Sequence, residues 1–303
     1  MLMNNILESV GNTPLVQLQG LPEDVADVYV KIEADNPSFS IKDRAVKFIL
    51  NDLMEKGQLK PGDTIIEETS GNTGIGLSAA GAALGLNVII VMPETMSDER
   101  KQLIRAYGAT LELTPGSEGM QGAADRAEAL AKEKGALLFG QFTNDANVKA
   151  HYETTGPEIM KDLPDVDAFV AGVGTGGTVT GVSKYLKEQN TDIQTYAVEP
   201  ADSPLLSEGK AGSHKIQGIG ANFVPQLFDK QYIDHFLTVT NEDAMAMMRR
   251  LASEQGILAG ISSGANVSAA LRVAKELGKG KKVVTVLPDT GERYLSAGIF
   301  GVE

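Results

Sequence analysis

The sequence predicts an α/β protein with mostly parallel sheets, because short β-rich apolar stretches alternate along the chain with stretches of helical periodicity. At 303 residues the chain is long enough for two packed domains or one large one. Its hydrophobic content of 42% and charged content of 22% are those of an ordinary globular protein.

The first predicted α/β unit extends from about residue 35 to residue 145. Apolar side chains at helical spacing follow Lys42 as far as Gly57, and the apolar stretch 64–66 runs into a loop at Thr69–Gly74. In chain order, we expect helices at 42–57, from the end of the Thr69–Gly74 loop through Ala83, at 98–108 and at 123–134, which alternate with strands at 64–66, 87–92, 110–113 and 136–139.

A second unit is predicted to start near Asp145. We expect strands at 167–171, 193–198 and 282–287, a helix at 178–189, and two further helices that begin near 241 and 262. The stretch 202–230 carries Gly, Ser, Lys and Pro without clear periodicity, and we interpret it as a functional loop region.

The composition excludes several classes of function. A net charge of −13 and a pI near 4.8 argue against a nucleic-acid partner, which would need clustered Lys and Arg. The chain has no Cys, which excludes disulfides and thiolate chemistry, and its three histidines, His151, His214 and His235, show no metal-ligand spacing. We therefore expect no metal site, and we interpret each His as a surface or hydrogen-bonded structural residue.

No apolar stretch approaches membrane-spanning length, and the first residues lack the basic and apolar regions of a secretory signal. We therefore expect no membrane association and a cytoplasmic location.

Two segments point to amino-acid chemistry. Ser40-Ile41-Lys42-Asp43-Arg44 puts a lysine at the start of an amphipathic helix, and Thr69-Ser70-Gly71-Asn72-Thr73-Gly74 forms a small polar loop between a strand and a helix. A nucleophilic amine together with a loop suited to a carboxylate suggests Schiff-base chemistry on an amino acid. Taken alone, each segment is also typical of a solvated helix start or an ordinary turn.

A third segment, Gly172-Val173-Gly174-Thr175-Gly176-Gly177-Thr178, follows a predicted strand and opens a helix. Its backbone N–H groups and hydroxyls could bind a phosphate dianion. The same glycine spacing is a dinucleotide fingerprint, with Glu199 placed where a ribose-binding acid belongs, so an NAD-dependent oxidoreductase is an alternative. The pyridoxal phosphate interpretation gives all three segments a role, whereas the dinucleotide interpretation leaves two of them without one.

The chain resembles the cysteine synthase (O-acetylserine sulfhydrylase) family of pyridoxal phosphate enzymes, which have the tryptophan-synthase-β fold (fold type II). The resemblance runs nearly from end to end, through segments in matching order and spacing. These segments are Gly11–Leu15, Ser40–Arg44, Thr69–Gly74, Met92–Ser97, Thr154–Ile159, Gly174–Thr178, Gly260–Gly264 and Gly291–Ser296.

The resemblance implies a role for each site residue. Lys42 would be the Schiff-base lysine, Asn72 would contact the cofactor 3-hydroxyl, and Ser262 would hydrogen-bond the pyridine nitrogen. The phosphate would be held by Gly174, Thr175, Gly176, Gly177 and Thr178. The substrate carboxylate would be bound by Thr69, Ser70, Gly71, Thr73 and Gln141.

The resemblance also implies the domain organisation: two three-layer α/β domains with mostly parallel sheets and the pyridoxal phosphate site in the cleft between them. The smaller, mobile domain would span residues 35–145 and carry the substrate loop. Residues 1–34 and 146–303 would form the larger domain, which holds the phosphate and the pyridine nitrogen.

The implied activity is β-replacement that makes L-cysteine from O-acetyl-L-serine and sulfide, through an aminoacrylate intermediate. Cystathionine β-synthase and serine dehydratase are alternatives within the fold. Family features of both the A-type and the B-type occur, with a lean to the B-type, whose members can accept thiosulfate; A-type members often bind serine acetyltransferase. We expect small-molecule substrates and a homodimer.

Phe39 is a large aromatic residue close to Lys42. Either it lines the route of the sulfur nucleophile, or it packs into the domain core, where truncation would cost about 3–5 kcal/mol.

Overall fold

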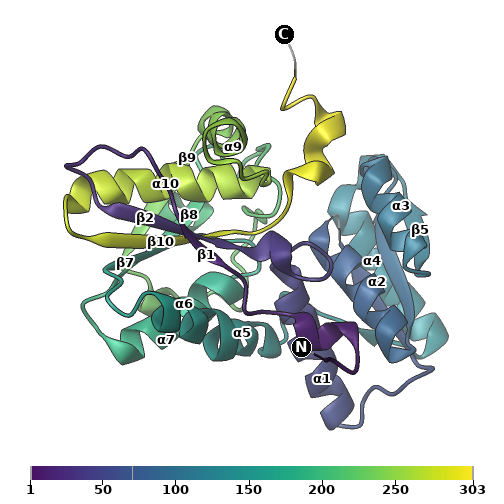
Figure 1. Cartoon of the computed structure of the whole chain (residues 1–303). Coiled ribbons are helices and arrows are strands. Elements are labelled where there is room, and N and C mark those ends of the chain that lie inside the picture. The colour runs from purple at the N-terminus through teal and green to yellow at the C-terminus, as the bar shows by residue number, and fades with distance from the viewer. Residues whose placement is uncertain (1, 70, 302–303) are drawn as a thin grey trace. The chain divides into compact units, whose positions relative to one another are not determined.

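The computed structural model of the chain describes residues 2–69 and 71–301 and divides it into two compact units (Figure 1). The first unit comprises the residues up to Val10 together with Asn36–Asn147. The second comprises Gly11–Asp35 and the chain from Val148 onward.

The first unit is built on a four-stranded sheet in which every pairing is parallel, in the order β5-β4-β3-β6. Its strands are β3 (Thr64–Glu68), β4 (Asn87–Pro93), β5 (Thr110–Thr114) and β6 (Leu137–Leu138). Its helices are α1 (Lys42–Glu55), α2 (Asn72–Leu84), α3 (Asp98–Ala106) and α4 (Gly119–Lys134). The short helix α5 (Ala146–Ala150) is where the chain passes into the second unit.

Alternate residues of β3 face opposite layers of the first unit, as the pleat of a strand requires. Ile65 joins the apolar cluster formed with α1 and α2, whereas Ile66 packs against α4 through Ala127 and Leu130. Helices therefore cover both faces of this sheet.

The second unit contains a six-stranded sheet in the order β1-β2-β10-β7-β8-β9. The pairing of β1 with β2 is antiparallel, and all the others are parallel. Its strands are β1 (Leu15–Gln17), β2 (Asp27–Ile32), β7 (Ala168–Gly172), β8 (Gln194–Pro200), β9 (His235–Val239) and β10 (Lys282–Leu287). Its helices are α6 (Gly156–Asp162), α7 (Gly177–Gln189), α8 (Leu205–Glu208), α9 (Asn241–Gln255) and α10 (Ile261–Leu277).

Helices also cover both faces of the second sheet, with α9 and α10 on one face and α6 and α7 on the other (Figure 1). The core between the sheet and α10 is formed by small and β-branched side chains such as Ala265, Ala269, Val273 and Val283, all fully buried. Small side chains let the helix lie close to the sheet.

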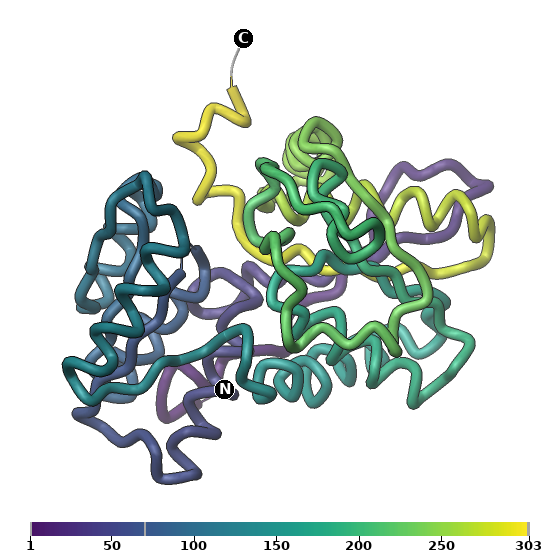
Figure 2. The backbone as a smooth tube through the Cα atoms, turned by 180° about the vertical axis from the view of Figure 1, so that it is seen from behind, coloured from purple at the N-terminus to yellow at the C-terminus, as the bar shows by residue number. Residues whose placement is uncertain are grey.

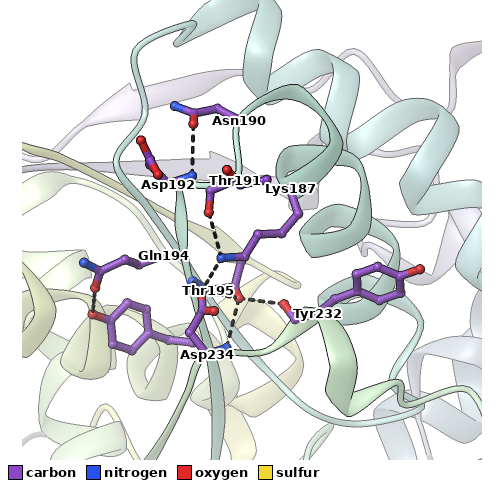
Figure 3. Close-up of polar contacts among 9 residues, drawn as sticks. Lys187, Asn190, Thr191, Asp192, Gln194, Thr195, Tyr232 and Asp234 are labelled. Carbon is purple, nitrogen blue, oxygen red and sulfur yellow. Dashed lines mark hydrogen bonds and ion pairs between the residues drawn. The ribbon is translucent and has the colours of Figure 1, made fainter.

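A polar cluster fixes the far end of α7 and the starts of β8 and β9 (Figure 3). Asp234 Oδ2 accepts from Lys187 Nζ at 2.6 Å and from the Thr195 N–H at 2.9 Å, and Thr195 Oγ1 donates to the Tyr232 carbonyl at 2.6 Å. Burial opposes ionisation of Asp234, but Lys187 and the Thr195 donors outweigh it and lower the pKa of this carboxyl. The cluster holds α7 in place, and the other end of α7 carries the glycine-rich loop.

The predicted fold class, α/β with mostly parallel sheets, is confirmed, and a helix or strand lies at each predicted position. The sequence analysis missed β1, β2, β9, α5, α6 and α8, which are short or lie outside the regular alternation; α8 falls within the stretch 202–230 that was interpreted as a loop region. The stretch 209–229 contains neither helix nor strand, and Figure 2 follows its irregular path in green.

One boundary differs from the prediction, which assigned residues 1–34 to the larger domain. The residues up to Val10 belong instead to the first unit. The reason is apolar burial, since Leu7 and Val10 share a cluster with Ile49 and Leu77.

None of the helices in the described part of the chain combines the length and apolar character that a membrane crossing needs.

Candidate active site

Lys42 is the first residue of α1 and is half-buried. Its backbone N–H donates to Ser40 Oγ at 3.3 Å. The next residue, Asp43, accepts the Ser38 N–H through Oδ2 at 2.6 Å and also bonds the Ser38 hydroxyl. Since Val46 of the same helix is buried in the core of the first unit, the backbone at Lys42 is held at a fixed place.

Phe39 does not pack into the core. Its side chain is 54% exposed, and its φ of +64° lies in the left-handed region that bulky residues rarely adopt. The alternative in which Phe39 is a buried core residue is therefore wrong. An exposed aromatic side chain on a strained backbone, three residues before Lys42, is typical of a functional position.

The loop that opens α2 joins residues that are far apart in the sequence. Thr73 Oγ1 donates to Gln141 Oε1 at 2.6 Å, across 68 positions, and both side chains are buried. Thr69 Oγ1 accepts the Gly71 N–H at 3.2 Å, which shapes the turn, and Asn72 is the first residue of α2. The structure thus brings together four of the five residues predicted to bind a substrate carboxylate; the fifth, Ser70, lies outside the described residues.

This loop can bind an anion by its position alone. It ends at the N-terminus of a 13-residue helix, where the N–H groups of the first turn and the helix dipole favour negative charge. A Cβ built on Gly71 meets nothing within 4 Å, so the backbone here is open to a ligand.

The glycine-rich loop between β7 and α7 is crowded. A Cβ on Gly174 would lie 2.4 Å from the Gly218 carbonyl oxygen, and one on Gly176, at φ +87°, would lie 2.7 Å from the Phe228 nitrogen. Thr175 Oγ1 accepts the Gly177 N–H at 3.3 Å and closes the turn. A side chain at either glycine would collide with neighbouring backbone, so the loop can pack in this way only with glycine there, as is typical of phosphate-binding loops.

Ser262 lies beside this loop within the second unit, near the start of α10. It is buried, and a Cβ on Gly218 would be 3.6 Å from its hydroxyl oxygen. Gly218 therefore lies next to Ser262 and also next to Gly174, in the glycine-rich loop Gly172–Thr178 (the phosphate-type loop). The predicted phosphate and pyridine-nitrogen residues are neighbours, joined by a segment that we had interpreted as a functional loop.

The sequence analysis missed a neighbour of the phosphate-type loop. His151 Nε2 lies 3.2 Å from Thr178 Oγ1, and its Nδ1 lies 2.9 Å from Thr155 Oγ1. His151 is buried in a π-helical turn, His151–Thr155. It is a hydrogen-bonded structural residue, as one of the two interpretations held, but it supports a predicted phosphate ligand. No spacing rule connects positions 151 and 178, so only the fold could reveal this contact.

The carboxylate of Glu199 is bonded to the backbone of its own unit, which weakens the dinucleotide alternative. Its two carboxylate oxygens accept the backbone N–H groups of Leu206 at 2.8 Å and Ser207 at 2.9 Å, at the start of α8.

Within the described residues, no group of three or more acidic or histidine side chains could hold a metal ion.

The sequence pattern of the family described as "Pyridoxal-phosphate dependent enzyme" matches residues 6–289. The chain belongs to this family. The predicted family and cofactor are confirmed.

Relatives in the family match over the full length of the chain. A cysteine synthase of Staphylococcus aureus (strain Mu50) is 51% identical over 99% of this chain and 98% of its own. The crystal structure of O-ureido-L-serine synthase superposes with a TM-score of 0.97 at 45% identity, covering 100% of this chain and 97% of that one. The structure of the Entamoeba histolytica cysteine synthase gives 0.96 at 42% identity, covering 100% and 92%.

The residues present fit the family's cofactor. Pyridoxal phosphate needs an amine for covalent attachment, a cradle for a phosphate dianion and a partner for its ring nitrogen. Lys42 would provide the first, the crowded Gly174–Thr178 loop would provide the second, and the buried hydroxyl of Ser262 would provide the third.

Proposed function

We propose that the protein is a cysteine synthase, which makes L-cysteine from O-acetyl-L-serine and sulfide with pyridoxal phosphate as cofactor. The observation that carries this proposal is the full-length similarity to the S. aureus cysteine synthase, at 51% identity. The retention of Lys42, the open carboxylate-type loop and the crowded phosphate-type loop in one chain supports it.

In this proposal each residue group has one task. Lys42 holds the cofactor covalently, Gly174, Thr175, Gly176, Gly177 and Thr178 bind its phosphate, Ser262 faces its ring nitrogen and Asn72 faces its ring hydroxyl. The substrate carboxylate binds at Thr69, Ser70, Gly71, Thr73 and Gln141. The bound cofactor supplies an electron-accepting ring that makes loss of the substrate α-proton feasible.

The protein side of the reaction then follows from these positions. The Lys42 amine, released when the substrate binds, accepts the α-proton. The C–O bond at the β-carbon breaks and acetate leaves with its electron pair. Hydrosulfide forms a C–S bond at the same carbon, and the Lys42 ammonium returns its proton to the α-carbon. Because Ser262 is a neutral hydroxyl, it does not favour a protonated ring nitrogen, and this restrains side reactions at the α-carbon.

The identity of the nucleophile that adds to the β-carbon is a separate part of the proposal. A relative of 45% identity is named O-ureido-L-serine synthase, and so makes a different β-substituted serine. Sulfide is our first choice and thiosulfate the second. Cystathionine β-synthase and serine dehydratase activities remain alternatives.

Mixing the purified protein with O-acetyl-L-serine and each candidate nucleophile tests the proposal. We expect a visible absorbance from bound cofactor that changes with O-acetyl-L-serine and returns when sulfide is added, with cysteine as product. Lys42→Ala should abolish turnover, whereas Lys56→Ala, at the other end of α1, should not. A protein that forms no cysteine but dehydrates serine or condenses homocysteine would overturn the assignment.

We further propose a cytoplasmic homodimer. A dimeric mass by light scattering would support the oligomeric state. The same measurement with serine acetyltransferase added tests whether that enzyme binds.

A further inference from the structure

Strand β3, which leads into the Thr69–Gly74 loop, carries a buried acidic residue to which the proposed function assigns no role. Glu67, on β3, is only 1% exposed. Its neighbour Glu68 is half-buried and, by the alternation of the strand, points to the opposite face, where α4 packs. A carboxyl group is rarely buried this completely without a function or a set of partners.

The partners of Glu67 lie at the end of the neighbouring strand, β6. Its Oε2 accepts the Gly140 N–H at 3.0 Å. Its Oε1 is buried, and no described residue lies in hydrogen-bonding geometry to it. Gly140 has a φ of +71°, and its carbonyl accepts the N–H of Asn144 at 3.0 Å, so the chain turns sharply directly above the carboxyl group of Glu67.

That turn positions Gln141. The carbonyl of Gln141 accepts Asn147 Nδ2 at 2.8 Å, and its side-chain oxygen accepts the Thr73 hydroxyl at 2.6 Å. A continuous series of contacts therefore runs from Glu67 through Gly140 and Gln141 to Thr73, in the first turn of α2.

The environment also sets the charge of Glu67. Burial raises the pKa of this carboxyl well above its ordinary value, and the nearby Glu68 raises it further. The Gly140 N–H and the backbone and side-chain amides of Gln141 act in the opposite direction. Burial therefore keeps the Glu67 carboxyl protonated over a wider pH range than an exposed Glu, and in that form it does not repel an incoming carboxylate.

We propose that Glu67 is a positioning residue for the substrate carboxylate: its carboxyl group holds the Gly140–Gln141 turn, and thereby sets the Gln141 amide and the Thr73 hydroxyl. The proposal rests on the proposed function for the identity of the substrate. Strand β3 then contributes to the site in two ways. It leads into the loop that opens α2, and its Glu67 side chain holds the turn at Gly140, which positions Gln141, the hydrogen-bond partner of Thr73.

The test is a double-mutant cycle on the intact, cofactor-loaded protein. The single variants are Glu67→Ala, Glu67→Asp, Glu67→Gln and Gln141→Ala. Two double variants combine Gln141→Ala with Glu67→Ala and with Glu67→Asp. Glu68→Ala is the matched control on the same strand. Each is measured for kcat and KM with O-acetyl-L-serine, for the dissociation constant of L-serine from the visible absorbance of the cofactor, and for Tm.

We expect Glu67→Ala to raise both KM and the L-serine dissociation constant about tenfold, with kcat nearly unchanged, because uniform binding of the carboxylate is lost. Glu67→Gln should restore both, since an amide can accept the Gly140 N–H and is neutral. In the Gln141→Ala background, Glu67→Ala should add little, because its effect passes through Gln141. Glu68→Ala should leave KM unchanged.

Fully additive effects in the cycle, or equal KM effects from Glu67→Ala and Glu68→Ala, would overturn the proposal. If Glu67→Ala does not fold, the cycle with Glu67→Asp decides, since that variant keeps the acid but withdraws it from Gly140 by one methylene. A wild-type protein that makes no cysteine refutes the proposed function. A wild-type protein that makes cysteine and is indifferent to Glu67 refutes only this inference.

Discussion

The two glycine-containing loops have the same local architecture and opposite surroundings. Each follows a parallel strand and opens a 13-residue helix, α2 in the first unit and α7 in the second. At Gly174 and Gly176 an added methyl group would strike backbone atoms at 2.4 and 2.7 Å, whereas at Gly71 it would meet nothing within 4 Å.

The difference in crowding between the two loops suggests which kind of ligand each loop can bind. The crowded loop is a fixed backbone surface, suited to a ligand that stays bound, such as a cofactor phosphate. The open loop instead carries hydrogen-bonded polar side chains, with Thr69 bonded to the Gly71 N–H and Thr73 bonded to Gln141, next to a glycine that has free space around it. The predictions below test this contrast, from the largest expected effect to the smallest.

Gly176→Ala should have the largest effect. The positive φ and the contact with Phe228 together should lower the free energy of unfolding by about 2–4 kcal/mol and weaken cofactor retention. Gly209→Ala is the matched control, since its φ of +72° is similar but its surroundings are open. It should cost only about 1 kcal/mol. Urea unfolding measures the stability of both variants, and cofactor dissociation measures how well each retains the cofactor. Equal losses of stability in Gly176→Ala and Gly209→Ala would show that crowding is unimportant.

Glu67 should make the stability of the protein depend on pH. Its pKa is raised in the fold, so the folded state keeps a proton that the unfolded chain releases above its ordinary value of 4.5. The free energy of unfolding, relative to Glu67→Gln, should therefore fall as the pH rises above that value, by at most about 1.4 kcal/mol per pH unit. Urea titrations at several pH values measure it. A difference between the two proteins that does not change with pH would contradict a buried, neutral Glu67.

Phe39→Gly should change the free energy of unfolding by less than about 1 kcal/mol, because relief of the positive φ and the larger entropy of an unfolded Gly have opposite signs. Phe39→Val, which is β-branched, should be less stable than Phe39→Asn, because only Asn tolerates the left-handed region. If Phe39 lines the nucleophile's route, Phe39→Gly also shifts the relative rates with sulfide and thiosulfate. An unaltered donor ratio excludes that role.

Gly71→Ala should leave the unfolding free energy nearly unchanged, because the added methyl group meets no atom of the protein. It should raise KM for O-acetyl-L-serine, because the methyl group occupies the space through which the carboxylate approaches. Steady-state kinetics and a melting curve on the same preparation measure both. Lost stability with unchanged KM would show that the site is not open to substrate.

Local patterns were enough to predict both loops, because strand and helix periodicity are properties of neighbouring residues and each loop lies where one period changes into the other. The contact of Thr73 with Gln141 was not predicted; the family resemblance implied only that both residues bind the substrate carboxylate. The contact depends on β6 lying beside β3, which the spacing of the chain does not encode.

The support given by His151 to Thr178, and by Glu67 to the turn at Gly140, could not be predicted at all. Each joins residues whose distance in the sequence, 27 and 73 positions, follows no motif. For Phe39 the residue type suggested burial, because aromatic residues are normally buried. The structure shows it exposed, on a backbone with positive φ that the sequence does not reveal.

The central claim is that the crowded loop binds the cofactor phosphate and the open loop binds the substrate carboxylate. The most direct test measures two quantities, the dissociation constant of pyridoxal phosphate and the KM for O-acetyl-L-serine, on Gly176→Ala and Gly71→Ala. The account predicts a crossed result, in which Gly176→Ala weakens the cofactor and Gly71→Ala weakens only the substrate. Equal loss of both ligands in both variants, or the reverse assignment, would contradict it.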